Sequence, residues 1–129
     1  MRRDPLPGGS SADGHGVCHC RDCQRASGGG PNYIALAPKS AFSVIAGTAK
    51  VHTTTADSGG KVGRAFCPEC GTPLWSEPAM DLPFVPIKAG ALDDASALTP
   101  MFHLWTGSAQ PWHTFDASAP RFETNPPAP

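Results

Sequence analysis

Five cysteines carry the most recognisable chemistry of this 129-residue chain, and they fall into two short clusters. The first is Cys18-x-Cys20-x-x-Cys23 and the second is Cys67-x-x-Cys70. Thiolates this close together are typical of zinc sites, because sulfurs from a single turn can hold the same ion. The sequence therefore predicts a small, soluble protein that binds one or two zinc ions per chain through cysteines.

The second cluster, Cys67 to Cys70, is typical of a zinc knuckle, in which two thiolates three residues apart grip a metal from a tight turn. Gly71 follows directly and allows the positive φ that such a turn needs. The alternatives are two buried free cysteines or a redox dithiol. A thioredoxin-type dithiol sits near a βαβ pattern, and the sequence shows none, so we favour the metal.

The first cluster can place three sulfurs on one metal. In an extended segment Cys18 and Cys20 face the same way, and a turn through the next two residues returns Cys23 beside them. Three protein ligands and an open fourth position are usual for a catalytic zinc. In the alternative, two of these cysteines join Cys67 and Cys70 in one closed four-thiolate site. Spacing alone leaves both arrangements open.

The charge of a three-thiolate site indicates which reaction it suits. Zn²⁺ with three thiolates carries a net charge of −1, so it is a weaker Lewis acid than zinc held by three imidazoles, and hydrolysis by a bound hydroxide is less attractive. A soft thiolate site suits a fourth, exogenous thiol that binds as a thiolate and acts as a nucleophile. We therefore expect a small thiol as substrate.

The elements that must position these cysteines are short. Arg21 to Ser27 predicts one helical turn, which the glycines from Gly28 onward end. Pro86, inside an apolar run, predicts an edge strand or a bulge. Brief apolar or alternating runs separated by turn residues predict an all-β domain of small antiparallel sheets. The predicted strands are Tyr33–Leu36, Phe42–Ile45, Lys50–Thr53, Arg64–Phe66, Pro73–Trp75, Phe84–Lys88, Phe102–Trp105 and Trp112–Phe115.

Composition sets the boundaries and excludes several classes of protein. Residues 1–16 are rich in Pro, Gly, Ser and Asp and predict a disordered leader, residues 17–123 a single domain, and residues 124–129 a flexible tail. The odd number of cysteines and the absence of an apolar run after Met1 favour the cytoplasm over a secreted disulfide framework. No membrane segment is expected. The net charge of −1 argues against nucleic acid as a partner.

Several further segments stand in a recognisable order beside the two cysteine clusters. The segments are Cys18–Gly29, Phe66–Leu74, Gly90–Asp94, His103–Trp105, Pro111–Trp112 and Pro120–Glu123. In this order they resemble the family of glutathione-dependent formaldehyde-activating enzymes, which also includes centromere protein V. The resemblance spans about residues 17 to 123.

The resemblance implies a β-tent-like fold of small antiparallel sheets with two zinc ions. It implies that Cys18, Cys20 and Cys23 hold a catalytic zinc, and that Cys67 and Cys70 supply half of a structural site. The implied reaction joins formaldehyde to glutathione, the co-substrate, and is a carbon–sulfur lyase reaction in the reverse sense. The alternative is a non-catalytic zinc module that binds a protein or another macromolecule.

The chain departs from the family pattern at its start. The family's structural zinc takes its other two ligands from an N-terminal Cys-x-Cys, and no cysteine precedes Cys18 here. Either the chain is shortened or the second site is degenerate. Cys67 and Cys70 could then be recruited to the first cluster, which would close the open position and abolish activity.

Other side chains could take part in catalysis or binding, but we expect structural or solvated roles for them. His103 and His113 could serve as acid–base groups. We expect instead that both lie on β-strands with their ring nitrogens hydrogen-bonded. Arg25 and Arg64 could hold a carboxylate of the thiol, although surface solvation is the default. Core packing is expected for the three tryptophans, Trp75, Trp105 and Trp112.

Overall fold

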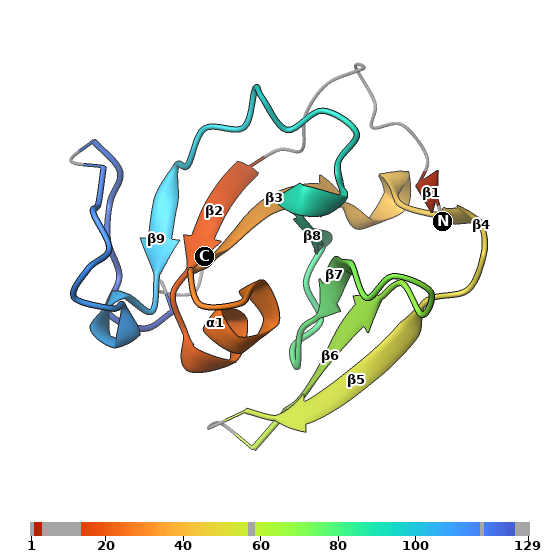
Figure 1. Ribbon diagram of the computed structural model, residues 1–129, viewed down its shortest axis with the longest axis horizontal. Coiled ribbons are helices and arrows are strands. Elements are labelled where there is room, and N and C mark those ends of the chain that lie inside the picture. Colours follow the sequence, from red (N-terminus) through yellow and green to blue (C-terminus); the bar gives the residue numbers. More distant parts are fainter. Residues whose placement is uncertain (1, 4–13, 57–58, 117, 126–129) are drawn as a thin grey trace.

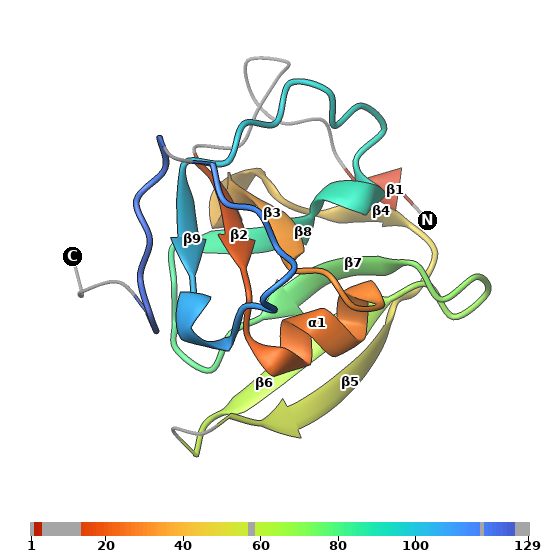
Figure 2. The same ribbon diagram turned by 60° about the vertical axis from the view of Figure 1, so that its left-hand side comes forward.

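The computed structural model describes residues 2–3, 14–56, 59–116 and 118–125, and most of its regular structure is β-sheet, as predicted. A seven-stranded mixed sheet has the strand order β5-β6-β7-β8-β3-β2-β9. The short helix α1 lies in the angle between β2–β3 and the β5–β6 hairpin in both views (Figures 1 and 2). The seven strands are β2 (Gly14–Cys18), β3 (Asn32–Pro38), β5 (Lys50–Thr55), β6 (Lys61–Phe66), β7 (Pro73–Glu77), β8 (Phe84–Lys88) and β9 (Phe102–Leu104).

The large sheet consists of two halves joined at one point. Strands β5, β6 and β7 form an antiparallel meander, and β8, β3 and β2 are also antiparallel, whereas β9 pairs parallel to β2. Trp75 opposite Ile87 is the single register pair between β7 and β8. Pro86 sits beside this sparse pairing, so β8 resembles an edge strand there and tolerates a residue without an N–H group. The predicted small sheets are therefore observed as halves of one sheet.

The remaining elements are short. Strand β1 (Arg2–Arg3) pairs antiparallel with β4 (Val44–Ala46) in a separate two-stranded sheet. In the described part of the chain, longer elements are connected by single turns of 3-10 helix, which are η2 (Lys39–Ala41), η3 (Ala89–Ala91) and η4 (Thr106–Ser108). No helix among the described residues is long and apolar enough to cross a lipid bilayer.

Strands and hydrogen bonds also involve described residues outside the domain expected at residues 17–123. Residues 2–3 and 14–16 of the expected leader form β1 and the start of β2, and residues 1 and 4–13 lie outside the described residues. At the other end, the Trp105 backbone N–H donates to the Thr124 carbonyl oxygen (3.1 Å), and its indole Nε1 donates to Asn125 Oδ1 (2.9 Å). The first two residues of the expected tail are therefore hydrogen-bonded to the domain, and residues 126–129 are not described.

Strand β2 was not predicted because it is rich in glycine. One of these glycines, Gly16, is required by the packing of the strand. Gly16 pairs with Phe102 on β9, and a Cβ atom at Gly16 would collide with the Phe102 ring. A glycine is therefore needed for the close approach of the two strands. The absence of side chains removes the alternating pattern by which a strand is recognised.

Substituting Gly16 tests this packing. We expect Gly16→Ala to lower the free energy of unfolding by about 1–3 kcal/mol, because the Phe102 ring must move away from the new methyl group. Gly14→Ala is the matched control, since its Cβ would lie 3.4 Å from the nearest Leu36 atom, an ordinary contact. Chemical denaturation of both variants measures the difference, and equal stability would contradict the packing argument.

The buried core is small, as expected for a chain with few large aliphatic residues. Ala65, Leu74 and Trp75 form one buried cluster, and the Trp75 ring packs edge-on against Phe42 with 5.2 Å between ring centroids. Trp112, in contrast, is 65% exposed. The expectation of core packing therefore holds for Trp75 and is wrong for Trp112.

Candidate metal centre

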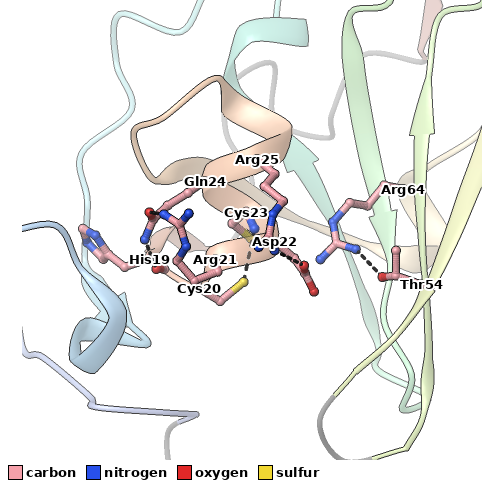
Figure 3. Close-up of polar contacts among 9 residues, drawn as sticks. All are labelled: His19, Cys20, Arg21, Asp22, Cys23, Gln24, Arg25, Thr54 and Arg64. Carbon is pink, nitrogen blue, oxygen red and sulfur yellow. Dashed lines mark hydrogen bonds and ion pairs between the residues drawn. The ribbon is translucent and has the colours of Figure 1, made fainter.

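The three cysteines of the first cluster converge where β2 meets α1 (Arg21–Ser27). Cys18 ends β2, Cys20 caps the helix in an extended conformation (φ −63°, ψ 155°), and Cys23 lies in its first turn. Their sulfur atoms all lie within 4.8 Å of one another. The Cys23 backbone N–H donates to Cys20 Sγ at 3.3 Å, as Figure 3 shows. The predicted grouping of three sulfurs is therefore present in the geometry.

Local contacts fix the helix that carries this cluster. Gly28 ends α1 in the left-handed region (φ +88°), and its N–H bonds to the Gln24 carbonyl oxygen, which confirms the predicted helix and its end. The Gln24 side chain is 3% exposed and donates to two backbone oxygens, those of His19 (2.7 Å) and Ser108 (2.9 Å). Gln24 thus ties the start of α1 to η4, a role that the sequence did not reveal.

Lys88 is a buried cation on the same face of the sheet as the cluster. Cys18 pairs with Asn32, and Ile34, two residues further along β3, pairs with Lys88 on β8. Residues paired across strands, or two apart along one strand, share a face, so Cys18 and Lys88 project from the same side. Lys88 is 5% exposed. An ionisable group this buried needs a compensating charge, and the nearby sulfurs can provide it.

Arg64 contributes a second cation to this face. It pairs with Ser76, next to the Trp75–Ile87 pair, so it shares the face of Lys88. Its Nη1 donates to Thr54 Oγ1 at 2.9 Å, and its buried Nε has no hydrogen-bond partner among the described residues. Figure 3 shows the guanidinium extending from β6 towards α1. Arg64 therefore departs from the expectation of simple solvation.

Arg25 lies on the exposed side of the helix. Its Nη1 forms an ion pair with Asp22 Oδ1 at 3.1 Å, and both side chains are largely exposed. Such a pair contributes little to stability because water screens it. This arrangement fits the default expectation of a solvated arginine.

The groups around Cys23 favour its thiolate form. Hydrogen bonds from the Cys18 and Cys20 thiols hold the pKa of Cys23 far below its ordinary value, and the positive charge of Lys88 adds to this effect. Hydrogen bonds to Cys20 and to Cys23, together with burial, raise the pKa of Cys18. Burial lowers the pKa of Lys88, and the charge on Cys23 opposes that shift. Without a metal, these shifts favour a thiolate on Cys23 that accepts hydrogen bonds from the Cys18 and Cys20 thiols.

This charge state predicts how zinc affinity depends on pH. Binding a metal to all three sulfurs must release the protons that Cys18 and Cys20 still hold, because thiolates are the ligands. We expect the zinc association constant to rise with pH, by up to about tenfold per proton for each pH unit. Competition with a chromophoric chelator across neutral pH measures it, and an affinity that does not change with pH would contradict the assignment.

Cys67 and Cys70 lie in the turn that joins β6 to β7. The Cys67 N–H donates to the Thr72 carbonyl oxygen (2.9 Å), and the Gly71 N–H donates to the Cys67 carbonyl oxygen (2.7 Å). Gly71 has the expected positive φ of +79°. Among the described residues, neither sulfur joins Cys18, Cys20 and Cys23 within 4.8 Å. The described residues thus group the first three sulfurs without Cys67 and Cys70, an arrangement that favours two separate sites over one closed four-cysteine site.

A second group of potential metal ligands was not foreseen. His19, His103 and His113 each place a ring nitrogen within 4.8 Å of the other two. The segment Trp112–Phe115, predicted as a strand, is a turn and loop instead, so His113 is no strand histidine. Figure 3 shows His19 pointing away from the Cys20 and Cys23 side chains. The two groups of ligands thus lie on opposite sides of the β2–α1 junction.

Fold and site together define an all-β protein with clustered cysteines that could hold a metal ion. The family model described as glutathione-dependent formaldehyde-activating enzyme matches residues 10–108, a stretch that includes both cysteine clusters. Because this match covers more than half of the sequence, the chain belongs to that family. None of the curated proteins matches the chain.

Proposed function

We propose that this protein is a zinc-dependent carbon–sulfur lyase of the family's type, which forms S-(hydroxymethyl)glutathione from glutathione and formaldehyde and catalyses the reverse reaction. The observation that carries the proposal is the convergence of the Cys18, Cys20 and Cys23 sulfurs within 4.8 Å on the face that also carries a buried lysine. Three soft donors fit zinc with a fourth position left for a thiol.

The reaction adds a thiol across a carbonyl group. The sulfur forms a bond to the formaldehyde carbon, the carbon–oxygen π bond breaks, and the thiol proton ends on the new hydroxyl oxygen. When bound, zinc would supply a position at which the substrate sulfur is held as a thiolate. The proposed ligands of this catalytic zinc are Cys18, Cys20 and Cys23.

The cations of the same face compensate the charge of the reacting groups. Zinc with four thiolates carries a net charge of −2, which is costly to bury without nearby positive charge. Lys88 faces the cysteine cluster and lowers the pKa of Cys23. Arg64, whose Nε lacks a described partner, can bind a carboxylate of the thiol substrate. We therefore assign Lys88 to charge compensation and Arg64 to substrate recognition.

Cys67 and Cys70 are proposed as ligands of a structural zinc. Their turn has the backbone hydrogen bonds and the positive-φ glycine of a zinc knuckle. Hydrogen bonds from Thr72 lower the pKa of Cys70 and favour its thiolate form. Two thiolates alone form a weak site, so this zinc would need further ligands from outside the described residues.

The test measures the rate of a reaction that also proceeds without a catalyst. Exchange NMR with ¹³C-labelled formaldehyde and glutathione reports how fast the free and thiol-bound forms interconvert. We expect zinc-loaded protein to accelerate this exchange and metal-free protein not to. If neither form accelerates it, and adding glutathione leaves the spectrum of cobalt-substituted protein unchanged, the protein is a non-catalytic zinc module.

A further inference from the structure

Three histidines from separate parts of the chain meet in the interior. His19 lies between β2 and α1, His103 lies on β9, and His113 lies in the loop after η4. His19 is 1% exposed and His103 is 3% exposed, while His113 is partly exposed. The Phe115 ring packs against all three imidazoles, with centroid distances of 5.0, 5.0 and 4.7 Å. The ring nitrogens of buried imidazoles lose their hydrogen bonds to water, so other interactions must replace those bonds.

Hydrogen bonding supplies only part of that compensation. His19 Nε2 lies 3.1 Å from His103 Nδ1, so one of these nitrogens donates to the other. Among the described residues, the ring nitrogens of His113 take no part in this bond, and His103 Nε2 is buried without a partner. Burying a polar atom without a hydrogen-bond partner costs free energy, because the atom loses its bonds to water. One hydrogen bond therefore compensates only part of the cluster, and the nitrogens that face one another are His19 Nε2 and His103 Nδ1.

The arrangement of the rings matches what a shared metal ion requires. Zinc–nitrogen bonds are about 2.0–2.1 Å long, so tetrahedral geometry places two ligand nitrogens about 3.4 Å apart and the ring centroids about 5 Å apart. The His19–His103 nitrogen distance is 3.1 Å. The three centroid distances are 5.3, 4.5 and 6.3 Å. These values bracket the geometry of a three-histidine site.

The burial of the cluster also suits a metal. His19 is 1% exposed and His103 is 3% exposed. Burial disfavours a charged imidazolium, and a neutral imidazole is the form that binds metals.

We propose that His19, His103 and His113 form a second metal site, separate from the three-cysteine cluster and selective for zinc or a similar borderline ion. Imidazole nitrogens suit Zn²⁺, Ni²⁺ and Cu²⁺, whereas Mg²⁺ and Ca²⁺ prefer oxygen ligands. The site holds whether or not the protein is a lyase, because it uses none of the cysteines.

Such a site would fasten the C-terminal part of the domain to its core. His103 and His113 belong to the segment that follows β8, whereas His19 begins the cysteine cluster, so one ion would link the two regions. Metal–ligand bonds stabilise small domains that have limited hydrophobic cores. The histidine-bound ion would be additional to the zinc ions proposed at the three-cysteine cluster and at Cys67 and Cys70.

Cobalt substitution of tag-free protein distinguishes the two kinds of site. Co²⁺ bound by thiolates gives a sulfur-to-metal charge-transfer band, whereas Co²⁺ bound by imidazoles gives only ligand-field bands and hyperfine-shifted imidazole N–H signals in proton NMR. We expect the wild-type protein to bind a sulfur-free cobalt ion in addition to the thiolate-bound ion. His113→Ala should lose the sulfur-free ion and retain the charge-transfer band.

The control variant is His52→Ala, because His52 is exposed on β5, away from the cluster, and is expected to retain both kinds of cobalt. His113 is only partly buried, so its replacement leaves the core residues in place. A wild-type protein without shifted imidazole signals, or a His113→Ala variant that keeps the sulfur-free cobalt, would overturn the proposal. If the wild-type protein binds the sulfur-free cobalt ion but shows no lyase activity when loaded with zinc, only the proposed function is contradicted.

Discussion

Cys23→Ser should abolish the proposed lyase activity and weaken zinc binding at the first cluster by about 100-fold or more. Removing even an outer partner of a metal ligand typically costs 10- to 100-fold in affinity, and losing a thiolate ligand should cost more. Hydrogen bonds from Cys18 and Cys20, with the charge of Lys88, lower the pKa of Cys23, so its replacement removes the sulfur that most readily becomes a thiolate ligand. Exchange NMR and chelator competition measure the two effects.

The substitution is chosen so that the fold survives. The hydrogen bond at the start of α1 runs from the Cys23 backbone N–H to Cys20 Sγ, and serine at position 23 leaves both groups in place. Cys70→Ser is the matched control, because Cys70 is exposed in the β6–β7 turn and outside the three-sulfur group. It should retain zinc at the first cluster. Equal losses in both variants would refute separate sites.

Local sequence rules predicted those parts of the site that lie close together in the chain. The spacing Cys18-x-Cys20-x-x-Cys23 brings the sulfurs together because a strand end and the first turn of a helix are both local structures. Gly28 ends that helix as expected. Each of these features depends on a few consecutive residues, so sequence alone was sufficient.

The missed features depend on pairing between distant segments. Lys88 faces the cysteines because two successive strand registers, from β2 to β3 and from β3 to β8, place it on the same side as Cys18. The pairing of Gly16 with Phe102 likewise joins residues far apart in the chain. A periodic pattern shows which residues share a face of one strand, but it does not show which strands are neighbours.

The histidine cluster was missed for the same reason. The segment Trp112–Phe115 alternates in a way that predicts a strand, yet it forms a loop because His113 and Phe115 pack against His19 from a distant segment. Tertiary contacts override a four-residue preference of this kind. Three single histidines scattered over the chain have no spacing that indicates a shared site, so only the structure brings them together.

Lys88→Met should lower kcat/KM for glutathione by roughly tenfold to a hundredfold and move the acid limb of the pH–rate profile to higher pH. A nearby unit charge at an effective dielectric constant near 20 contributes on the order of 1–3 kcal/mol. A cation stabilises the thiolate form, so its removal raises the pKa of the bound thiol by about one unit for each 1.4 kcal/mol lost. Activity therefore requires a higher pH.

Methionine keeps the apolar length of the lysine side chain, so the core around β8 stays filled. Lys88→Arg retains the charge and should restore part of the rate and the original pH dependence. Lys39→Met is the control, because Lys39 is exposed and paired with Asp81 at 3.0 Å in a solvated ion pair. A Lys88→Met variant with lowered activity but an unchanged pH profile would show that Lys88 supports the fold and does not compensate the charge of the bound thiolate.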